Sequence, residues 1–400
     1  MLKDKNILLC VTGGIAAYKA VQLVSLLKKA SANVKVIMTE HACKFVTPLT
    51  FQTMSENPVY VDMFHPLSNM DVEHISLAKW ADLIVVAPAT ANTIAKINLG
   101  IGDNMLTTVL LAKRSPVLIA PAMNTKMMDN PVNKKHLKEL EDKDFIILPC
   151  GDGRLACGDI GTGKMLDPEQ ILEYIEIGVS SPDFKDKNII ITAGGTREAL
   201  DPVRYLGNRS TGKMGYAIAR EARNRGANVI LITAPTSLTP PEGVKVVPVE
   251  STKDMYQAVE DHFEKSDIFI CPAAPADYKA KHYSDHKIKK TQGDDTLVVE
   301  FDRNPDILQT FGNKKGNRIV VGFAAESQKV TDYASKKLNK KNLDFIVANN
   351  ITKKGAGFSS DTNIVTIIDK EGPHELEMMG KDELAKVIMD KIKGILEQKS

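Results

Sequence analysis

The chain has 400 residues, of which 43% are hydrophobic and 26% charged, with a formal net charge of +2 at pH 7. This length exceeds one compact core and suits two domains, while the near-neutral charge gives no reason to expect nucleic acid as a partner. The five cysteines are scattered without a CxxC pair, and no apolar run approaches membrane-spanning length. We therefore expect a soluble cytosolic (cytoplasmic) protein with reduced thiols, no structural zinc site and no membrane segment.

Two stretches of the chain begin alike. Residues 3–14 read KDKNILLCVTGG and residues 185–195 read KDKNIIITAGG, so each places a short apolar run before a Gly-Gly pair. A buried parallel strand that enters a tight turn and then a helix has this pattern. A later strand repeats as well, because residues 81–89 resemble residues 266–274. The repetition predicts two successive nucleotide-type α/β units.

Composition places the boundary between the two units. Residues 178–183 read GVSSPD, which is typical of a linker. We therefore predict an α/β protein of two Rossmann-like domains with mostly parallel sheets. The first domain spans residues 1–178, the linker residues 179–186 and the second domain residues 187–400.

The first Gly pair, Gly13 and Gly14, precedes apolar residues at helical spacing from Val21 to Leu27. The free backbone N–H groups at such a helix N-terminus favour a phosphate group. The GxGxxG dinucleotide fingerprint is absent, so the phosphate of a mononucleotide fits better than a dinucleotide. The alternative is a Gly pair that serves only the turn.

Residues 85–93, VVAPATANT, end a buried strand in small and hydroxyl side chains, including Thr90. Open α/β sheets bind ligands outside the carboxyl ends of their strands, where Thr and backbone donors hold a phosphate or a ring edge. A plain helix N-cap is the alternative. The segment 102–108, GDNMLTT, is similar in kind and equally ambiguous.

Three residues of the first unit are candidates for acid–base or binding chemistry. His74 begins an amphipathic helix, where a surface or capping role is the alternative to a base. Asn124 follows a buried strand and suits either a helix cap or an amide that holds a carboxylate. Cys157 lies in a glycine-rich loop near Arg and Lys, so its thiol is either an acid or nucleophile or an incidental cysteine.

The second unit is more basic around its loops. Residues 208–215, NRSTGKMG, open a helix with backbone donors, an Arg and a Lys, which suits a phosphate or a developing oxyanion. Walker A spacing is absent, and a solvated turn is the alternative. The run 287–290, KIKK, supplies cations of the kind that a triphosphate needs, although most charge runs are solvated.

In this order, the segments resemble one family across nearly the whole chain, the bifunctional coenzyme A biosynthesis proteins called CoaBC or Dfp. The first half resembles homo-oligomeric flavin-containing cysteine decarboxylases through TGGIAAYK, the His74 segment, PAMNTKMM and GRLACG. The second half resembles phosphopantothenate-cysteine ligases through ITAGGTREALDPVRYLGNRSTGKMG, AAPADY, KIKK, NPDI, GFAAE and KKNLD. The resemblance implies the flavoprotein decarboxylase fold followed by the ligase fold.

Two consecutive reactions are implied by the resemblance. In the ligase half, CTP with Mg²⁺ activates the carboxylate of 4′-phosphopantothenate as an acyl-cytidylate with loss of pyrophosphate, and the amine of cysteine then displaces CMP. In the decarboxylase half, the cysteine thiol of that product is oxidised by FMN toward a thioaldehyde, so that the carbanion left by departing CO₂ is delocalised as an enethiolate. The electrons then return from reduced flavin, and 4′-phosphopantetheine results.

The family's functional positions fall on residues of the right type. The resemblance makes His74 the decarboxylase base, Asn124 the amide for the substrate carboxylate and Cys157 the proton donor on a mobile flap. In the ligase half, Asn208 matches the residue required for the acyl-cytidylate to be consumed. The implied FMN contacts are Gly13, Gly14, Thr39, Thr90 and Thr107. The implied CTP contacts are Ala273, Ala274, Asp277, Lys287, Pro305, Asp306, Ile307, Leu308, Phe323, Lys337 and Lys341, and no metal ligand is assigned.

The resemblance also implies an assembly. Decarboxylase halves form trimers that build dodecamers, ligase halves dimerise, and FMN lies between subunits, whereas no nucleic acid or membrane is involved. Two positions depart from the family pattern. Met128 stands where relatives often carry an aromatic residue, and Pro275 removes a backbone N–H beside the nucleotide contacts.

Two other functions compete with this one. An NAD(P)-dependent short-chain oxidoreductase predicts a GxGxxG turn, which neither half contains. A flavin- or nucleotide-binding regulatory module predicts loss of His74, Asn124 or Cys157, and all three are present. We therefore expect a bifunctional enzyme.

Overall fold

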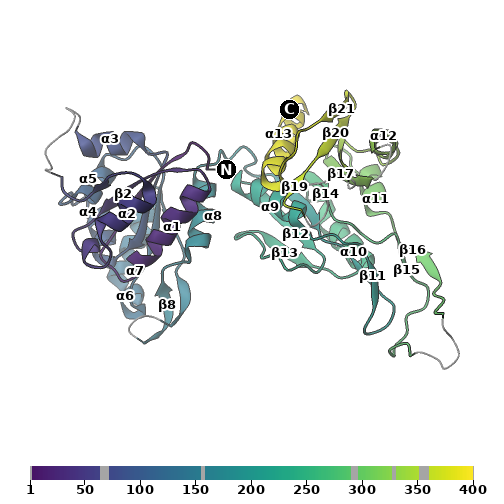
Figure 1. Ribbon diagram of the computed structural model, residues 1–400, viewed down its shortest axis with the longest axis horizontal. Coiled ribbons are helices and arrows are strands. Elements are labelled where there is room, and N and C mark those ends of the chain that lie inside the picture. Colours follow the sequence, from purple (N-terminus) through teal and green to yellow (C-terminus); the bar gives the residue numbers. More distant parts are fainter. Residues whose placement is uncertain are drawn as a thin grey trace. The chain divides into compact units, whose positions relative to one another are not determined.

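The computed structural model describes residues 2–63, 72–154, 158–289, 296–326, 330–350 and 360–399 of the chain. It divides into two compact units, Met1–Ser180 and Ser181–Ser400. Each unit is a sheet with helices on both faces (Figure 1), which confirms the predicted α/β fold with mostly parallel sheets. Within the described residues, no helix combines the length and the apolar character that a membrane span requires.

The described part of the first unit contains a sheet of six strands in which all neighbouring strands are parallel. The strands are β1 (Asn6–Val11), β2 (Asn33–Met38), β3 (Val59–Tyr60), β4 (Leu83–Ala89), β5 (Val117–Pro121) and β6 (Phe145–Ile147). Their order across the sheet is β3-β2-β1-β4-β5-β6, so the direction of winding reverses between β1 and β4. In open sheets of this kind, ligands bind beyond the carboxyl ends of the strands at that switch point.

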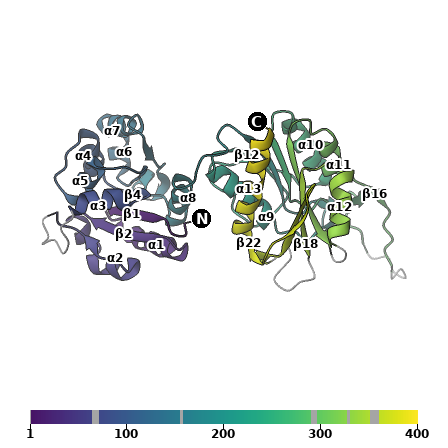
Figure 2. The same cartoon turned by 90° about the horizontal axis from the view of Figure 1, so that it is seen from above.

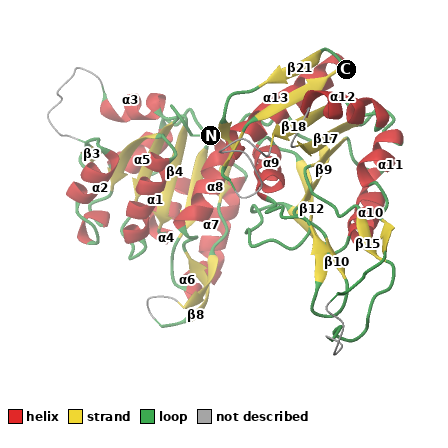
Figure 3. Cartoon of the chain, turned by 45° about the vertical axis from the view of Figure 1, so that its right-hand side comes forward, coloured by secondary structure: helices red, strands yellow, loops and turns green. Residues whose placement is uncertain are grey.

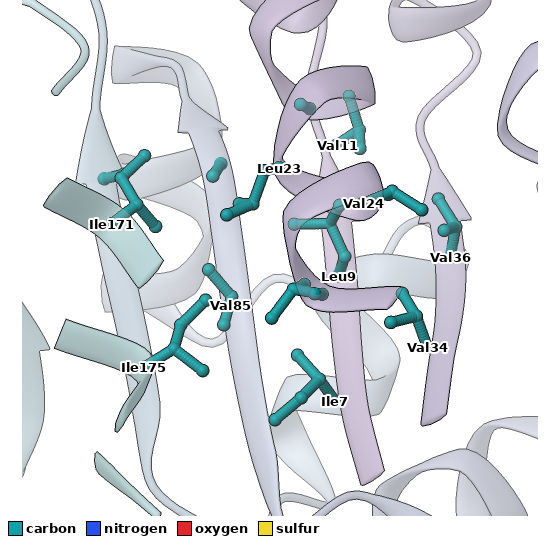
Figure 4. Close-up of a cluster of buried hydrophobic side chains, with 14 of the residues drawn as sticks. Ile7, Leu9, Val11, Leu23, Val24, Val34, Val36, Val85, Ile171 and Ile175 are labelled. Atoms are coloured by element: carbon teal, nitrogen blue, oxygen red, sulfur yellow. The ribbon is translucent and has the colours of Figure 1, made fainter. Parts of the chain in front are cut away.

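Helices cover both faces of this sheet (Figure 2). They are α1 (Ala17–Lys29), the 3₁₀ turn η1 (Ala42–Lys44), α2 (Pro48–Ser55), α3 (Glu73–Trp80), α4 (Ala91–Leu99), α5 (Met105–Leu111), α6 (Thr125–Asp129), α7 (Pro131–Glu141) and α8 (Pro168–Gly178). One hydrophobic cluster lies between the sheet and α1, α2 and α8, and another between the sheet and α3, α4, α5 and α7. In the first, Leu23 and Val24 of α1 and Ile171 of α8 pack onto β1, β2 and β4 (Figure 4). A hairpin of β7 (Gly151–Arg154) and β8 (Ile160–Lys164) follows β6.

The second unit repeats this architecture in a wider sheet. Its described residues form eight strands in the order β13-β12-β9-β14-β17-β18-β20-β21. The strands are β9 (Asn188–Ala193), β12 (Asn228–Thr233), β13 (Lys245–Pro248), β14 (Ile268–Cys271), β17 (Ile319–Glu326), β18 (Phe345–Asn350), β20 (Val365–Asp369) and β21 (Gly372–Glu375). Pairing is parallel from β13 to β18 and antiparallel at β20 and β21. The predicted repeat is present, since β9 takes the central place that β1 has in the first sheet.

Helices again lie on both faces of the second sheet (Figure 3). One face is covered by α9 (Lys213–Asn224) and α13 (Lys381–Lys399), and the other by α10 (Thr252–Phe263), α11 (Ile307–Asn313) and α12 (Val330–Lys340). Short antiparallel ribbons pair β10 (Arg197–Ala199) with β11 (Tyr205–Gly207), β15 (Tyr278–Ala280) with β16 (Phe301–Arg303), and β19 (Thr362–Asn363) with β22 (Met379–Gly380).

The boundary between the two compact units, after Ser180, falls within the segment predicted as a linker, residues 179–186. Phe184 has no exposed surface and packs in the core of the second unit. The guanidinium of Arg225 lies 4.9 Å from the centre of the Phe184 ring and donates hydrogen bonds of 2.8 and 2.6 Å to the carboxylate of Asp183. Residues from Asp183 onward are therefore anchored to the second unit by packing and by a bidentate ion pair.

Replacing Phe184 with Ala is expected to lower the free energy of unfolding of the second unit by about 3–5 kcal/mol, because a buried ring is lost and a cavity remains. Phe301→Ala is the control, since Phe301 is 41% exposed and its loss should cost less than about 1 kcal/mol. Urea denaturation of the full-length variants, with hydrogen exchange followed in each unit, measures both losses. Equal losses for the two variants would contradict an anchor at the boundary.

Candidate functional sites

A cavity of about 680 Å³ lies in the first unit beyond the carboxyl ends of its central strands. The loops after β1, β2, β4 and β5 line it through Gly13 and Gly14, Thr39, Thr90 and Asn124, respectively. This is the switch point of the sheet, where the fold places a ligand. Four of the five residues expected to contact FMN therefore surround one cavity together with Asn124.

The Gly pair after β1 lies against the loop after β2. A Cβ atom on Gly13 would lie 2.3 Å from Cβ of His41, so a larger residue does not fit without a shift of the backbone. Helix α1 begins at Ala17, and its N-cap residue, Ala16, makes no side-chain hydrogen bond. Gly14 and Ala16 both line the cavity, so the uncapped start of α1 borders it, as an anion-binding site requires.

Asn124 is the N-cap of α6. Its Oδ1 accepts a hydrogen bond of 2.8 Å from the backbone N–H of Lys126, and its Nδ2 donates one of 2.7 Å to Oδ2 of Asp159. The side-chain amide thus already binds a carboxylate. This geometry is compatible with both functions considered for Asn124, capping and carboxylate binding.

The hairpin of β7 and β8 lies against the loop that carries Asn124. The backbone N–H of Met123 donates a hydrogen bond of 3.0 Å to the carbonyl of Gly163. Gly163 has a φ of +139°, and a Cβ atom there would lie 2.3 Å from the carbonyl oxygen of Met123, so this close approach requires glycine. Cys157, expected on a flap, belongs to the connection between β7 and β8 and lies outside the described residues.

Two further residues expected at this site are not among the described residues that line the cavity. His74 is half-buried in α3 and is not among the described residues that line the cavity. Thr107 is buried in α5, where its hydroxyl donates a hydrogen bond of 3.3 Å to the carbonyl of Asn104, and it lines a neighbouring hollow of about 390 Å³. Within one chain, the structure therefore brings Asn124 together with the Gly pair, but not with His74.

A second site lies in the other unit, where a hollow of about 270 Å³ opens beyond the carboxyl ends of β14, β17 and β18. We call it the α9 hollow, because Ser210–Gly215, at the start of α9, forms one wall. The N-cap of α9 is Gly212, with a φ of +80° and no side-chain hydrogen bond, so this helix start also suits a phosphate. The expected CTP contacts that line the α9 hollow are Ala273, Ala274, Phe323 and Lys337.

Asn208 holds the loop that follows β14. Its Nδ2 donates hydrogen bonds of 3.1 and 3.0 Å to the carbonyls of Ala274 and Pro275. Asn304, the first residue of the NPDI motif, donates a further bond of 2.9 Å to the carbonyl of Ala276. Two side-chain amides therefore fix this loop beside the α9 hollow.

The other expected CTP contacts are not among the described residues that line the α9 hollow: Asp277, Lys287, Pro305, Asp306, Ile307, Leu308 and Lys341. The ammonium of Lys341 pairs at 2.9 Å with Asp306, which caps α11. The side chains of Ile307 and Leu308 are buried in the core, so only their backbone atoms are able to meet a nucleotide. Asp277, Lys287 and Pro305 are exposed.

The two halves of the chain match two family models. Residues 1–179 match the model described as Flavoprotein, and residues 184–396 match the DNA/pantothenate metabolism flavoprotein C-terminal domain. The coenzyme A biosynthesis bifunctional protein CoaBC of Bacillus subtilis (strain 168) is 50% identical to the chain, over 100% of the chain and 99% of that protein. The chain belongs to the CoaBC family.

Other CoaBC sequences agree with this assignment. The protein of that name from Vibrio cholerae is 44% identical over 97% of the chain and 98% of its own length. A crystal structure of the C-terminal domain of a CoaBC protein is 44% identical, covers 55% of the chain and 100% of that structure, and has a TM-score of 0.47. The resemblance drawn from the motifs is confirmed, and the chain is a bifunctional enzyme of coenzyme A biosynthesis with a flavoprotein first half.

Basic residues that were not singled out from the sequence also line the cavity of this CoaBC chain, among them Lys19, His41, Arg154 and Lys164. Lys19 is almost buried, and its ammonium donates hydrogen bonds of 2.7 Å to Asp167 and 3.3 Å to the carbonyl of Met165. The bond from Lys19 lowers the pKa of the Asp167 carboxyl. Lys19 is the last residue of the motif TGGIAAYK. The motif therefore pointed to this cavity residue, whereas the helical spacing of apolar residues did not.

Gly13→Ala is expected to prevent flavin binding, because the added methyl group meets His41. The flavin content of the purified protein, read from its visible absorbance, should fall by at least about tenfold. Gly394→Ala, in α13, is the matched control, since a Cβ there has no heavy atom within 4 Å. That variant should keep its flavin and gain about 0.5–1 kcal/mol of stability.

One group of side chains in the described residues has the composition of a metal site. Ligand atoms of Asp369, Glu371 and His374 lie within 4.8 Å of one another. These residues belong to the β20–β21 hairpin and line neither the cavity nor the α9 hollow, and Asp369 is already paired with Lys391. This group therefore does not identify the Mg²⁺ site expected with CTP.

Proposed function

We propose that the first unit is an FMN-dependent phosphopantothenoylcysteine decarboxylase and the second a CTP-dependent phosphopantothenate-cysteine ligase. The observation that carries the proposal is the hydrogen bond of 2.7 Å from the Asn124 amide, in the wall of the 680 Å³ cavity, to a carboxylate. A decarboxylase has to hold a carboxylate beside its cofactor, and the bond from Asn124 to the Asp159 carboxylate supports this role for Asn124. Membership of the CoaBC family supports both activities.

The cavity fits a flavin mononucleotide. Its volume falls within the range of cofactor sites, about 300–1,000 Å³. Gly13, Gly14 and the start of α1 would hold the phosphate, and Thr39 and Thr90 would offer hydroxyl groups. Bound there, FMN would supply the two-electron oxidation, and later the re-reduction, of the substrate carbon that carries the thiol.

Three side chains carry the proposed decarboxylation. Asn124 binds the substrate carboxylate through Nδ2, in the place that Asp159 takes in the structure. His74 accepts the proton released as the thiol is oxidised, and Cys157 donates a proton when the enethiolate is converted to the thiol product. These roles follow the family positions of the three residues.

A second copy of the chain is proposed to complete the decarboxylase site. His74 lies outside the cavity that Asn124 lines, and Thr107 lies in the neighbouring hollow. Large apolar side chains that are at least 49% exposed border these two spaces: Ile15, Tyr18, Leu111 and Met127. Apolar surface of this kind is typical of an interface between copies. We expect trimers of this unit and dimers of the ligase unit, which together build a dodecamer.

In the second unit, the start of α9 and Lys337 would bind the CTP phosphates, and Phe323 and Ala273 would border the nucleoside. A carboxylate oxygen of 4′-phosphopantothenate attacks the α-phosphorus and pyrophosphate leaves; the amine of cysteine then attacks the acyl carbon and CMP leaves. Mg²⁺ would neutralise charge on the phosphates. Further proposed CTP contacts are Ala274, Asp277, Lys287, the backbone of residues 305–308 and Lys341.

The described cysteines Cys10, Cys43, Cys150 and Cys271 are free thiols. Burial raises the pKa of Cys150 and that of Cys271 to about 11, so both are protonated near neutral pH. Unpaired thiols support the proposed cytoplasmic location.

The absorbance spectrum and turnover of the purified protein test the proposal. Incubation with 4′-phosphopantothenate, cysteine, Mg²⁺ and either CTP or ATP is followed by mass spectrometry of the products. Flavin absorbance bands together with CTP-dependent formation of 4′-phosphopantetheine and CO₂ support both activities. A colourless protein that stops at 4′-phosphopantothenoylcysteine would contradict the decarboxylase, and the absence of any product would favour a regulatory module instead.

A further inference from the structure

Lys381 is a buried lysine at the N-terminus of a helix, where a positive charge is unfavourable. It is the first residue of α13, and only 8% of its surface is exposed. Helix α13 packs beside α9 on one face of the second sheet (Figure 2), and Lys213 is the first residue of α9. Two lysines that are far apart in the sequence therefore stand at the starts of two neighbouring helices.

Both lysines line the α9 hollow, and both also line an adjoining hollow of about 410 Å³. They therefore lie where the two spaces meet. Among the described residues that line the α9 hollow, three are lysines and none is acidic: Lys213, Lys337 and Lys381. A space with this lining favours an anion.

Several features oppose a positive charge on Lys381. Burial, and then repulsion by Lys213, hold the pKa of the Lys381 ammonium below its usual range. A helix N-terminus carries the positive end of the helix dipole, which adds to the repulsion. The ammonium of Lys381 also donates a hydrogen bond to the carbonyl of Ser360, which stabilises its position. The carboxylate of Asp361 acts in the opposite direction on the pKa of Lys381, but it pairs at 2.6 Å with Lys213 and 88% of that acidic side chain is exposed to water. A bound polyanion would offset both the cost of burying the Lys381 ammonium and the repulsion by Lys213.

We propose that Lys381, together with Lys213 and the start of α9, binds the β- and γ-phosphates of CTP and stabilises the pyrophosphate leaving group. This inference rests on the proposed ligase function. Phe323 and Ala273 line only the α9 hollow, which suits the nucleoside, whereas the two lysines lie toward the adjoining hollow, which suits the phosphate tail.

The ligase chemistry gives this cation a function in the reaction. When the carboxylate oxygen of the acid substrate bonds to the α-phosphorus, the bond from that phosphorus to the oxygen bridging to the β-phosphate breaks. The electron pair of the broken bond stays with pyrophosphate, whose negative charge increases. A fixed ammonium at this position stabilises that charge as it develops.

Affinity measurements on the full-length protein test the proposal. In calorimetric titrations with Mg²⁺ present, Lys381→Met should weaken binding of CTP and of inorganic pyrophosphate about 10- to 100-fold. Binding of CMP, which lacks the β- and γ-phosphates, should change less than about threefold. Lys381→Arg should restore most of the affinity for CTP. Lys386→Met is the matched control, because Lys386 is exposed on the same helix and lines neither hollow.

Three results would overturn the assignment of Lys381. The first is equal affinity for CTP in the wild type and in Lys381→Met. The second is an equal loss of affinity for CTP and CMP. The third is weaker binding of 4′-phosphopantothenate with CTP binding unchanged, which would assign the ammonium to the phosphate of the acid substrate. Lys381→Gln repeats the test with a polar side chain if the Met variant misfolds. A wild-type protein that binds no CTP would contradict the ligase function itself. If the wild type binds CTP and Lys381→Met binds it equally tightly, only the function of Lys381 is contradicted, and the ligase function is not.

Discussion

Two inactive decarboxylase variants, mixed before assembly, are expected to regain activity. His74→Gln and Asn124→Asp should each lower the decarboxylation rate by at least about 100-fold, since the first removes the proposed base and the second replaces an N–H donor with a carboxylate. Asn124 lines the cavity, and His74 of the same chain is not among the described residues that line it. A site that takes His74 from the Asn124→Asp copy and Asn124 from the His74→Gln copy would then contain both native side chains.

The two variants, carrying different affinity tags, are co-expressed and purified through both tags in turn. If each site takes His74 from one copy and Asn124 from another, about a quarter of the sites carry both native residues after random mixing. Decarboxylation of 4′-phosphopantothenoylcysteine, divided by ligase activity as an internal standard, should therefore recover to about a quarter of the wild-type value. Activity in mixtures that stays at the level of the single variants would contradict a site shared between copies.

Asn130→Asp and His136→Gln are the matched controls for this experiment. Asn130 caps α7 by accepting a hydrogen bond of 2.9 Å from the N–H of Val132, as Asn124 caps α6, so the Asp variant tests the cost of altering a cap in this region. His136 is half-buried and hydrogen bonds to Asn98 at 2.9 Å outside the cavity. Both controls should decarboxylate within about twofold of the wild-type rate.

Asn208→Asp is expected to stop the ligase and leave the decarboxylase unchanged. The Nδ2 of Asn208 donates to two carbonyls, and a carboxylate there would place an oxygen against both carbonyl oxygens. Loss of two hydrogen bonds and the added repulsion should displace the loop after β14 and lower the ligase rate by at least about 100-fold. Because the position matches the one required to consume the acyl-cytidylate, that intermediate should accumulate.

Mass spectrometry of reactions with CTP, 4′-phosphopantothenate and cysteine measures both the intermediate and the product. Asn57→Asp is the control, because Nδ2 of Asn57 also donates to two carbonyls, at 3.0 Å each, but in the first unit. Asn57→Asp should lower the free energy of unfolding of the first unit and leave the ligase rate unchanged. A rise in the KM for CTP with kcat unchanged in Asn208→Asp would show that this loop only binds nucleotide.

Local patterns in the sequence were sufficient for the fold and the family. A strand buried on both faces of a parallel sheet needs a continuous apolar run, which is why β1 and β9 could be predicted from residues 7–11 and 189–191. The grouping of Thr90 and Asn124 was also predictable in outline, because parallel strands bring their carboxyl ends to one edge of the sheet. Strand and turn signals extend over a few residues, so the sequence alone contains them.

Only the tertiary structure decided which side chains share a space. His74 and Asn124 both lie in family motifs, yet a motif does not say whether two side chains meet in one chain. Ile307 and Leu308 belong to an expected nucleotide-binding turn, but their side chains pack in the core. Lys381 starts an amphipathic helix, where a lysine is typically exposed, and it becomes buried because α13 packs beside α9. Such contacts join residues far apart in the chain, and they depend on how whole helices pack on the sheet rather than on any local pattern.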